Sequence, residues 1–267
     1  MLFVHGAFVN SHLWDGVIDH LVASGASLDL IAPDLPLGAH HRRMNAGTDL
    51  TVSGITSMLI GVLDALELDQ VVVVANDSGG AITQHMLASH PTRFSGVLLT
   101  STEAADNFPP KYFRFLFPPL RLRAFMWSTG QLLRTNVGRR LPITFGHLFK
   151  RRLTSEEART LMGPVWGSPG ARNDLRLFLI AATDDPDLLK RAEARFDQLG
   201  APVDIAWTAC DRVFPDSDAD RLADRFPRGR RVGDITDSGS LSPFDQPEQV
   251  AQRVLGLLAR TTAEQQA

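Results

Sequence analysis

The strongest chemical signal in the sequence is a turn of small and polar residues after a β-branched run. The run covers residues 71–75 and leads into Asn-Asp-Ser-Gly-Gly at 76–80, after which a helix is predicted. A strand that passes into a helix through so tight a turn can hold one side chain in a strained, accessible position, as nucleophilic catalysis requires. Asp77 and Ser78 are the two side chains that could attack.

The neighbours of this turn favour one of the two candidates. A nucleophile in such a turn needs small residues two positions before it and two positions after it. With Asp77 these positions hold Ala75 and Gly79, whereas with Ser78 the first of them would be Asn76. Because alanine is smaller than asparagine, we expect Asp77 to be the nucleophile. An ordinary strand-to-helix turn capped by the Asp77 side chain is the structural alternative.

The turn belongs to a chain in which predicted strands and helices alternate. This alternation is typical of an α/β protein with a mostly parallel sheet flanked by helices, in which ligands bind at the carboxyl ends of the strands. The polar tail after Arg260 is predicted to fray. We expect strands at 2–4, 28–33, 71–75, 96–100, 203–207 and 231–235, and helices at 13–23, 51–66, 81–89 and from Pro247.

One segment differs in kind from its flanks. Between Asn107 and Ser155 there are ten Lys or Arg residues and no Asp or Glu, although the chain has a net charge of −3. We therefore predict a core at 1–106, an inserted helical cap at 107–195, and the second part of the core at 196–267. The basic cap could be a lid, a surface for an acidic substrate, or an element that touches a membrane or a partner. Solvated arginines on a helical insertion are the simpler interpretation.

Composition excludes several classes of protein. Of the 267 residues, 44% are hydrophobic and 21% are charged, which is neither a disordered nor a fibrous composition. Cys210 is the only cysteine, and neither a signal peptide nor a membrane span is evident. We expect a cytoplasmic monomer or homodimer that binds a small molecule and no nucleic acid. No cofactor and no metal are expected, because dinucleotide-type glycine spacing and metal-type His/Cys clusters are missing.

Several short motifs together resemble the α/β-hydrolase fold superfamily. His-Gly-Ala-Phe at 5–8, continued by Ser-His-Leu-Trp at 11–14, looks like the loop that supplies an oxyanion-hole N–H, and 75–80 looks like the nucleophile elbow. Trp-Thr-Ala-Cys-Asp at 207–211 resembles the W-G-x-x-D segment, and Asp-Ser-Gly at 237–239 marks the place of the catalytic histidine. Within the superfamily, the chain is most similar to the branch with an aspartate nucleophile, which includes haloalkane dehalogenases and epoxide hydrolases.

This resemblance implies a set of site residues. Asp77 would attack carbon, and Asp211 would orient the catalytic histidine. The N–H groups of Ser78 and of either Ala7 or Phe8 would form the oxyanion hole. The protein would then be a hydrolase that holds a small, largely apolar molecule between core and cap.

The place of the catalytic histidine is occupied by Ser240. All eight histidines lie at or before His147, so the family's order of nucleophile, acid and histidine cannot be completed. Because histidine activates the water that breaks the ester on the aspartate, turnover requires a substitute base, and His5 and His12 are candidates. A hydrogen bond that holds the loop, for His5, and a solvated helix start, for His12, are simpler roles.

The missing base leaves other functions open. A non-catalytic binding protein of the same fold is one alternative. An esterase that uses Ser78 is another, although it lacks the same histidine. Glu103 occupies an alternative position for the catalytic acid in this superfamily, and an exposed loop glutamate is the simpler interpretation of it.

Further departures from the family bear on the substrate. The dehalogenases that the chain resembles have tryptophan after the nucleophile and asparagine in the oxyanion loop, where this chain has Ser78 and Ala7. Epoxide hydrolases protonate the epoxide oxygen with cap tyrosines, and Tyr112 is the only tyrosine here. A packing role is the simpler interpretation of Tyr112.

The start of the sequence also departs from the family. Two strands normally precede the oxyanion loop, whereas the first predicted strand here already ends at His5. Without those strands, the predicted strand at 28–33 would be an uncovered apolar edge. We therefore expect the natural start to lie upstream.

Overall fold

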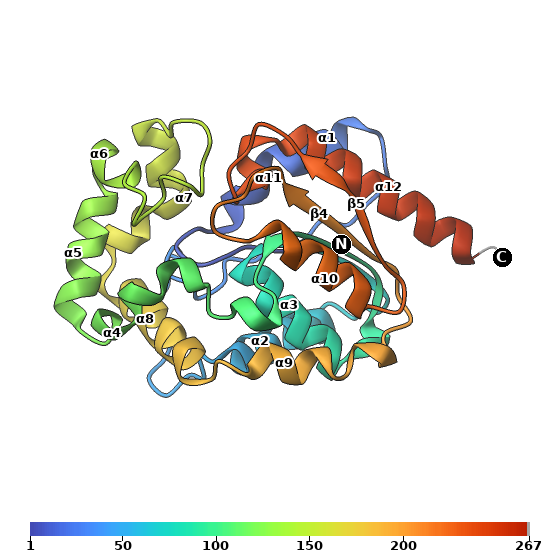
Figure 1. Ribbon diagram of the computed structural model, residues 1–267, viewed down its shortest axis with the longest axis horizontal. Helices are drawn as coiled ribbons and strands as arrows, with labels where there is room; N and C mark the ends of the chain where they lie inside the picture. Colours follow the sequence, from blue (N-terminus) through green and yellow to red (C-terminus); the bar gives the residue numbers. More distant parts are fainter. Residues whose placement is uncertain (266–267) are drawn as a thin grey trace.

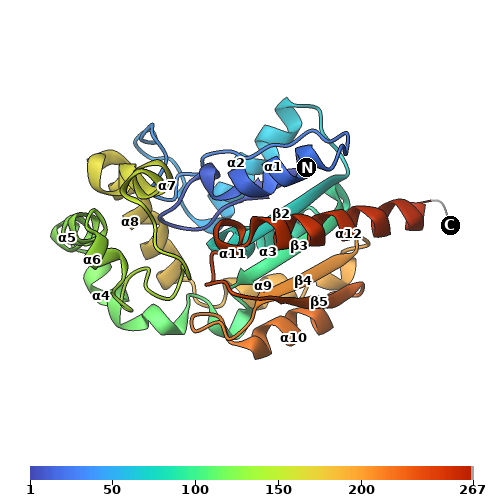
Figure 2. The same cartoon turned by 90° about the horizontal axis from the view of Figure 1, so that it is seen from above.

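The computed structural model describes residues 1–265, which contain a five-stranded parallel sheet (Figures 1 and 2). The strands lie side by side in chain order, and each pairs with the next in parallel register. This arrangement confirms the predicted α/β class, and all five carboxyl ends point to one edge of the sheet. The strands are β1 (Leu2–Val4), β2 (Val71–Asp77), β3 (Phe94–Thr102), β4 (Val203–Thr208) and β5 (Gly229–Ile235).

Helices cover both faces of the sheet. In the view of Figure 1, α1 and α12 pack against each other above the sheet, and α2, α3 and α9 lie below it. The apolar sides of these helices and the β-branched run of β2 form the core. The helices outside the predicted cap are α1 (Asp15–Ala23), α2 (Val52–Ala65), α3 (Ser78–Ser89), α10 (Asp216–Arg225), α11 (Ser242–Asp245) and α12 (Pro247–Gln265). The last helix of the segment predicted as the cap, α9 (Leu188–Glu193), packs on α3 beside the sheet.

The segment predicted as the cap contributes helices at one end of the molecule, beyond the carboxyl ends of the strands (Figure 1). Thr154 and Glu157 form a reciprocal capping box at the start of the helix Ser155–Gly167 in this segment. The helices are α4 (Phe117–Leu120), α5 (Arg123–Leu133), α6 (Asn136–Arg139), α7 (Ser155–Gly167) and α8 (Pro169–Asp184). Short 3₁₀ turns lie at Ser11–Trp14, Pro91–Arg93, Ala105–Asn107, Lys111–Leu116 and Phe196–Gln198.

A buried polar contact joins α8 to the loop at 36–47. His40 Nε2 lies 3.1 Å from Asp174 Oδ2, and both side chains are buried. The main-chain N–H of Met44 donates to the same carboxylate oxygen at 2.8 Å. This contact fixes one end of the cap segment to the core, which matters because the cavity described below lies between them.

The structure corrects two predicted elements. The segment 28–33 is not a strand, because only Ile31 forms a bridge, to Leu2, and Pro33 has no N–H to continue a ladder. No apolar edge strand therefore forms there. The described part of the tail, residues 261–265, does not fray, since α12 continues to Gln265, and residues 266 and 267 lie outside the described residues. Thr261 is buried, and Gly96 of β3 leaves room for its methyl group.

No helix in the described part of the chain is both long enough and apolar enough to cross a bilayer.

Candidate active site

Asp77 occupies a strained backbone conformation between β2 and α3. Its φ is 53° and its ψ is −138°, a backbone conformation that residues other than glycine rarely adopt. The structure holds this turn by close packing: a Cβ on Gly79 would lie 2.2 Å from the Val4 carbonyl oxygen, and one on Gly6 would lie 2.0 Å from Asp77 Oδ2. Only glycine fits at either position. The residue with the strained backbone is Asp77, whereas Ser78 begins α3 in helical conformation.

Two main-chain N–H groups donate to the Asp77 carboxylate. One belongs to Ser78 and the other to Ala7. The N–H of Phe8 donates instead to the Leu37 carbonyl at 2.8 Å, so Ala7 supplies the contact from this loop. Burial raises the pKa of Asp77 to about 6, although both N–H groups oppose this shift.

Glu103 follows directly after β3 and is only 1% exposed. The expectation of an exposed loop glutamate is therefore wrong. Burial, together with the negative charge of Asp77, raises the pKa of Glu103 to about 8. The Thr102 hydroxyl donates to Glu103 Oε2 at 3.3 Å. The Ser78 side chain lies near both carboxyl groups and favours their ionised forms.

Asp211 is hydrogen-bonded to Ser240, the residue at the position where the family resemblance expects a histidine. Its Oδ1 accepts hydrogen bonds from the N–H groups of Val213 (2.8 Å) and Phe214 (3.0 Å) and from the Ser240 hydroxyl (2.8 Å). Its Oδ2 is buried and has no hydrogen-bond partner among the residues that the structure describes. Burial raises the pKa of Asp211. The acid is therefore oriented, and one of its oxygens lacks the donor that an imidazole would supply.

Asn76 holds the loop that carries Ser240. Its Nδ2 donates to the Ser240 carbonyl at 2.9 Å and to the Thr100 carbonyl at 3.1 Å. The side chain is fully buried. An asparagine before the strained turn therefore connects β2, β3 and the loop after β5, a role that the sequence did not indicate.

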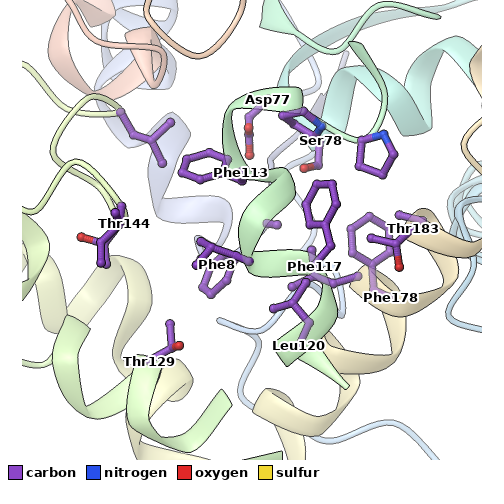
Figure 3. Close-up of a pocket in the computed structure, with 18 of the residues that line it drawn as sticks. Phe8, Asp77, Ser78, Phe113, Phe117, Leu120, Thr129, Thr144, Phe178 and Thr183 are labelled. Carbon is purple, nitrogen blue, oxygen red and sulfur yellow. The ribbon is translucent and has the colours of Figure 1, made fainter. Parts of the chain in front are cut away.

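A cavity of about 410 Å³ lies over these groups, between the strand ends and the cap helices (Figure 3). Most of its lining is aromatic or aliphatic. Among the described residues, its only ionisable side chains are Asp77 and Glu103. Figure 3 shows Phe8, Phe113, Phe117 and Phe178 around the approach to Asp77 and Ser78, with Thr129, Thr144 and Thr183 adding hydroxyl groups.

The family of this chain is shown by a match over most of its length. A family model described as alpha/beta hydrolase fold matches residues 1–247. The chain belongs to the α/β-hydrolase fold family. The expected superfamily is thereby confirmed.

Part of this α/β-hydrolase is similar to curated haloalkane dehalogenases. It is 34% identical over 97 residues to the enzyme of Mesorhizobium japonicum, a match that covers 36% of this chain and 30% of the relative. It is 31% identical over 102 residues to the enzyme of Psychrobacter cryohalolentis, covering 38% of this chain and 33% of the relative. The matches thus span about a third of the length of these relatives.

Solved structures share the fold of this α/β-hydrolase over nearly its whole length. A haloalkane dehalogenase from Bradyrhizobium elkani has a TM-score of 0.74 at 18% identity, covering 98% of this chain and 90% of that one. A thermophilic esterase from Thermogutta terrifontis has a TM-score of 0.73 at 20% identity, covering 97% of this chain and 89% of that one. At these identities the likeness concerns the fold.

The two candidate substitute bases of this α/β-hydrolase lie outside the cavity lining. His5 is buried, with Nε2 accepting the Leu35 N–H at 2.9 Å and Nδ1 lying 2.8 Å from the Gly6 carbonyl oxygen. Burial lowers the pKa of His5 to about 4. His12 is exposed and contacts Asp15 at 2.8 Å. Both ring nitrogens of His5 are engaged and His12 is exposed, so both geometries match the simpler roles.

Tyr112 lies beside the cavity without lining it. Its hydroxyl donates to the Pro142 carbonyl at 3.2 Å, and its ring packs edge-on against Phe113, which does line the cavity.

In the part of the chain that the structure describes, no three His, Cys, Asp or Glu side chains gather as metal ligands would. The predicted strand at 96–100 ends at Thr100, which would leave Glu103 in a loop. A strand extended by two residues, to Thr102, puts Glu103 at the strand end.

Proposed function

We propose that this protein hydrolyses a small, largely apolar, uncharged molecule through a covalent ester on Asp77. The observation that carries the proposal is the Asp77 carboxylate itself. It stands in a strained turn on the floor of an apolar cavity and accepts N–H bonds from Ala7 and Ser78. An ionised carboxylate held in a dry cavity is a better nucleophile than one in water, because it has lost its hydration shell.

The proposed reaction has two stages. An oxygen of Asp77 bonds to a substrate carbon as the leaving group departs, which gives an ester. Water then adds to the carbonyl carbon of that ester, and the N–H groups of Ala7 and Ser78 stabilise the oxyanion. One such donor typically contributes about 10²–10³ in rate. Loss of the alcohol returns the Asp77 carboxylate.

Covalent trapping tests this function directly. The protein and its Asp77→Asn and Ser78→Ala variants would be incubated with alkyl halides, epoxides and activated esters, and then mapped by peptide mass spectrometry. We expect an adduct on the peptide with Asp77 in the parent and in Ser78→Ala, and none in Asp77→Asn. In a single turnover in water labelled with heavy oxygen, the product should carry unlabelled oxygen from Asp77.

A second candidate function is non-catalytic binding, and the Asp211–Ser240 hydrogen bond favours it. The Ser240 hydroxyl satisfies the acid that a catalytic histidine would otherwise use. If no compound modifies the protein while apolar molecules stay bound in native mass spectrometry, the binding function replaces the hydrolase. An adduct on Ser78 that disappears in Ser78→Ala would instead favour the serine esterase.

A further inference from the structure

We propose that Glu103 is the proton donor and proton acceptor of this site, and that the site therefore takes epoxides, whose leaving oxygen needs a proton, in preference to alkyl halides. The proposal rests on the proposed function of Asp77 as the nucleophile. It replaces both the missing histidine and the cap tyrosines with one carboxyl group that the cavity already contains.

The geometry sets Glu103 apart from every other titratable residue. It and Asp77 are the only ionisable side chains that line the cavity among the described residues; Glu103 is buried and Asp77 is half-buried. The loop at 5–8, the start of α3 and the cap helices contribute apolar groups and hydroxyls to the lining. Asp211, outside the lining, adds negative charge near Asp77. No cation is paired with either cavity acid within residues 1–263.

The surroundings of the two acids indicate which of them carries a proton. Two acids that share one cavity resist being ionised together, because the charge of each disfavours the charge of the other. The negative charge of Asp77 accordingly raises the pKa of Glu103. Asp77 has the N–H groups that favour a carboxylate, whereas Glu103 lies beside the charge of Asp77. Glu103 is therefore the acid that keeps its proton.

The first step consumes that proton. An oxygen of the Asp77 carboxylate bonds to one carbon of the epoxide ring, and the bond from that carbon to the ring oxygen breaks. The ring oxygen receives the electron pair and takes the proton of Glu103. The step leaves a hydroxyalkyl ester on Asp77 and a carboxylate on Glu103.

The second step returns the proton to Glu103. The Glu103 carboxylate takes a proton from water while the water oxygen bonds to the ester carbonyl carbon. When the ester bond breaks, the departing alkoxide takes the remaining proton of that water, which frees the diol. Esterification removes the charge of Asp77, and this lowers the pKa of Glu103 for as long as the ester exists. Glu103 is thus an acid before the ester forms and a base while it persists.

The same groups disfavour halide as a leaving group. A halide ion leaves without a proton but needs donors that stabilise its charge. Two acids lie on the cavity floor, and no tryptophan lines the cavity among the described residues. Styrene oxide and phenethyl bromide, which share the same phenyl group, are therefore suitable paired probes.

The test compares Glu103→Gln with the parent on both probes. Glutamine keeps the shape of the side chain but has no acidic proton to transfer. We expect diol formation from styrene oxide to fall by about 10²–10⁴-fold, the usual contribution of a general acid or base. Phenethyl bromide should still alkylate Asp77 in Glu103→Gln, and this ester should persist there but decay in the parent. Glu103→Asp should retain part of the activity, and Glu156→Gln, an exposed acid of α7, should resemble the parent.

Two results would overturn the proposal in different ways. If Glu103→Gln matches the parent on styrene oxide while Asp77→Asn is inactive, Asp77 remains the nucleophile and Glu103 is only structural. If neither probe ever modifies Asp77 in any folded variant, the proposed function fails as well. Circular dichroism and thermal unfolding of each variant distinguish a lost proton donor from a lost fold.

Discussion

Asp211 and Ser240 are hydrogen-bonded at the place where the family resemblance puts the acid and the histidine of a triad. Asp211 keeps three hydrogen bonds to Oδ1, and Asn76 still holds the Ser240 main chain. The unpartnered Oδ2 of Asp211 is available to a new donor. A histidine placed at 240 would therefore meet an acid that is already oriented.

This leads to a prediction for Ser240→His in the Glu103→Gln background. We expect the imidazole to restore ester hydrolysis, because it supplies the base that Glu103→Gln has removed. The ester formed with phenethyl bromide should decay at least about 10²-fold faster than in Glu103→Gln alone, as followed by intact-protein mass. Adding Asp211→Asn should remove the gain. An ester equally stable with and without histidine would contradict the expected geometry.

The two cavity acids predict how activity depends on pH. Epoxide opening needs Asp77 ionised, so kcat/KM should rise as pH increases through about 6. It also needs Glu103 protonated, so kcat/KM should fall as pH increases through about 8. These values belong to the interacting pair, with Asp211 as the third acid nearby. Rates measured across this range should give a bell, and residual activity of Glu103→Gln should lack the falling limb.

Stability should depend on pH for the same reason. A carboxyl group whose pKa rises from 4.5 to about 8 on folding stabilises the folded protein fully below 4.5, and this contribution is lost as pH rises through about 8. Glu103→Gln has no such proton to lose. Relative to the parent, its free energy of unfolding should therefore increase by about 1–3 kcal/mol between acidic and mildly alkaline pH. Urea unfolding measures this, with Glu156→Gln as the control that should show no such trend.

The sequence predicted those site features that depend on local pattern. Asp77 was favoured because small residues surround it, and the strained turn agrees with that preference. Features that depend on distant chain segments were missed. Ala7 and not Phe8 supplies the N–H at Asp77 because the Phe8 N–H donates to the Leu37 carbonyl. His5 Nε2 is not free to act as a base because it accepts the Leu35 N–H. Such contacts become visible only when the loop at 36–47 is placed against β1.

At the scale of elements, the turn between β2 and α3 depends on the close approach of α3 to β1. The Val4 carbonyl oxygen would lie 2.2 Å from a Cβ on Gly79. Main-chain atoms cannot yield as a flexible side chain can, so β1 or α3 must shift if the glycine is replaced.

We therefore predict opposite effects for two glycine substitutions. Gly79→Ala should reduce the free energy of unfolding by at least ~2 kcal/mol and displace Asp77. Gly61→Ala, on the exposed side of α2 where nothing lies within 4 Å of the added Cβ, should increase it by about 0.5–1 kcal/mol. Both changes add one methyl group, so chemical denaturation of the pair isolates the effect of space. A Gly79→Ala protein as stable as the parent would contradict the packing described.

Most elements were predictable because their periodicity matches their burial. The apolar run at 71–75 became a buried central strand, and the helical spacing at 51–66 became α2. The two corrected elements failed for tertiary reasons. Pro33 limits its segment to a single bridge, and the Thr261 side chain packs on Gly96 where composition alone indicated a free tail.

At the scale of the whole molecule, the His40–Asp174 contact joins the core loop to the cap helix that lines the cavity. Removing His40 would leave a buried carboxylate with one donor fewer. We predict that His40→Ala lowers the free energy of unfolding by about 2–3 kcal/mol. It should also increase proteolytic cleavage in the loop at 36–47.

His41→Ala is the matched control for this prediction, because His41 is the exposed neighbour of His40. Its unfolding free energy and its cleavage pattern should stay close to those of the parent. Equal behaviour of the two variants would mean that the His40–Asp174 contact does not hold the cap.

The acidic floor of the cavity also determines which molecules can remain in it. With only carboxyl groups to ionise, the described lining is neutral or negative at every pH and never positive. An anion that enters gives up its hydration and finds no counterion in exchange. The cavity is therefore a filter by charge. Neutral molecules can settle against its aromatic walls, and a product that becomes acidic is expelled as soon as it ionises.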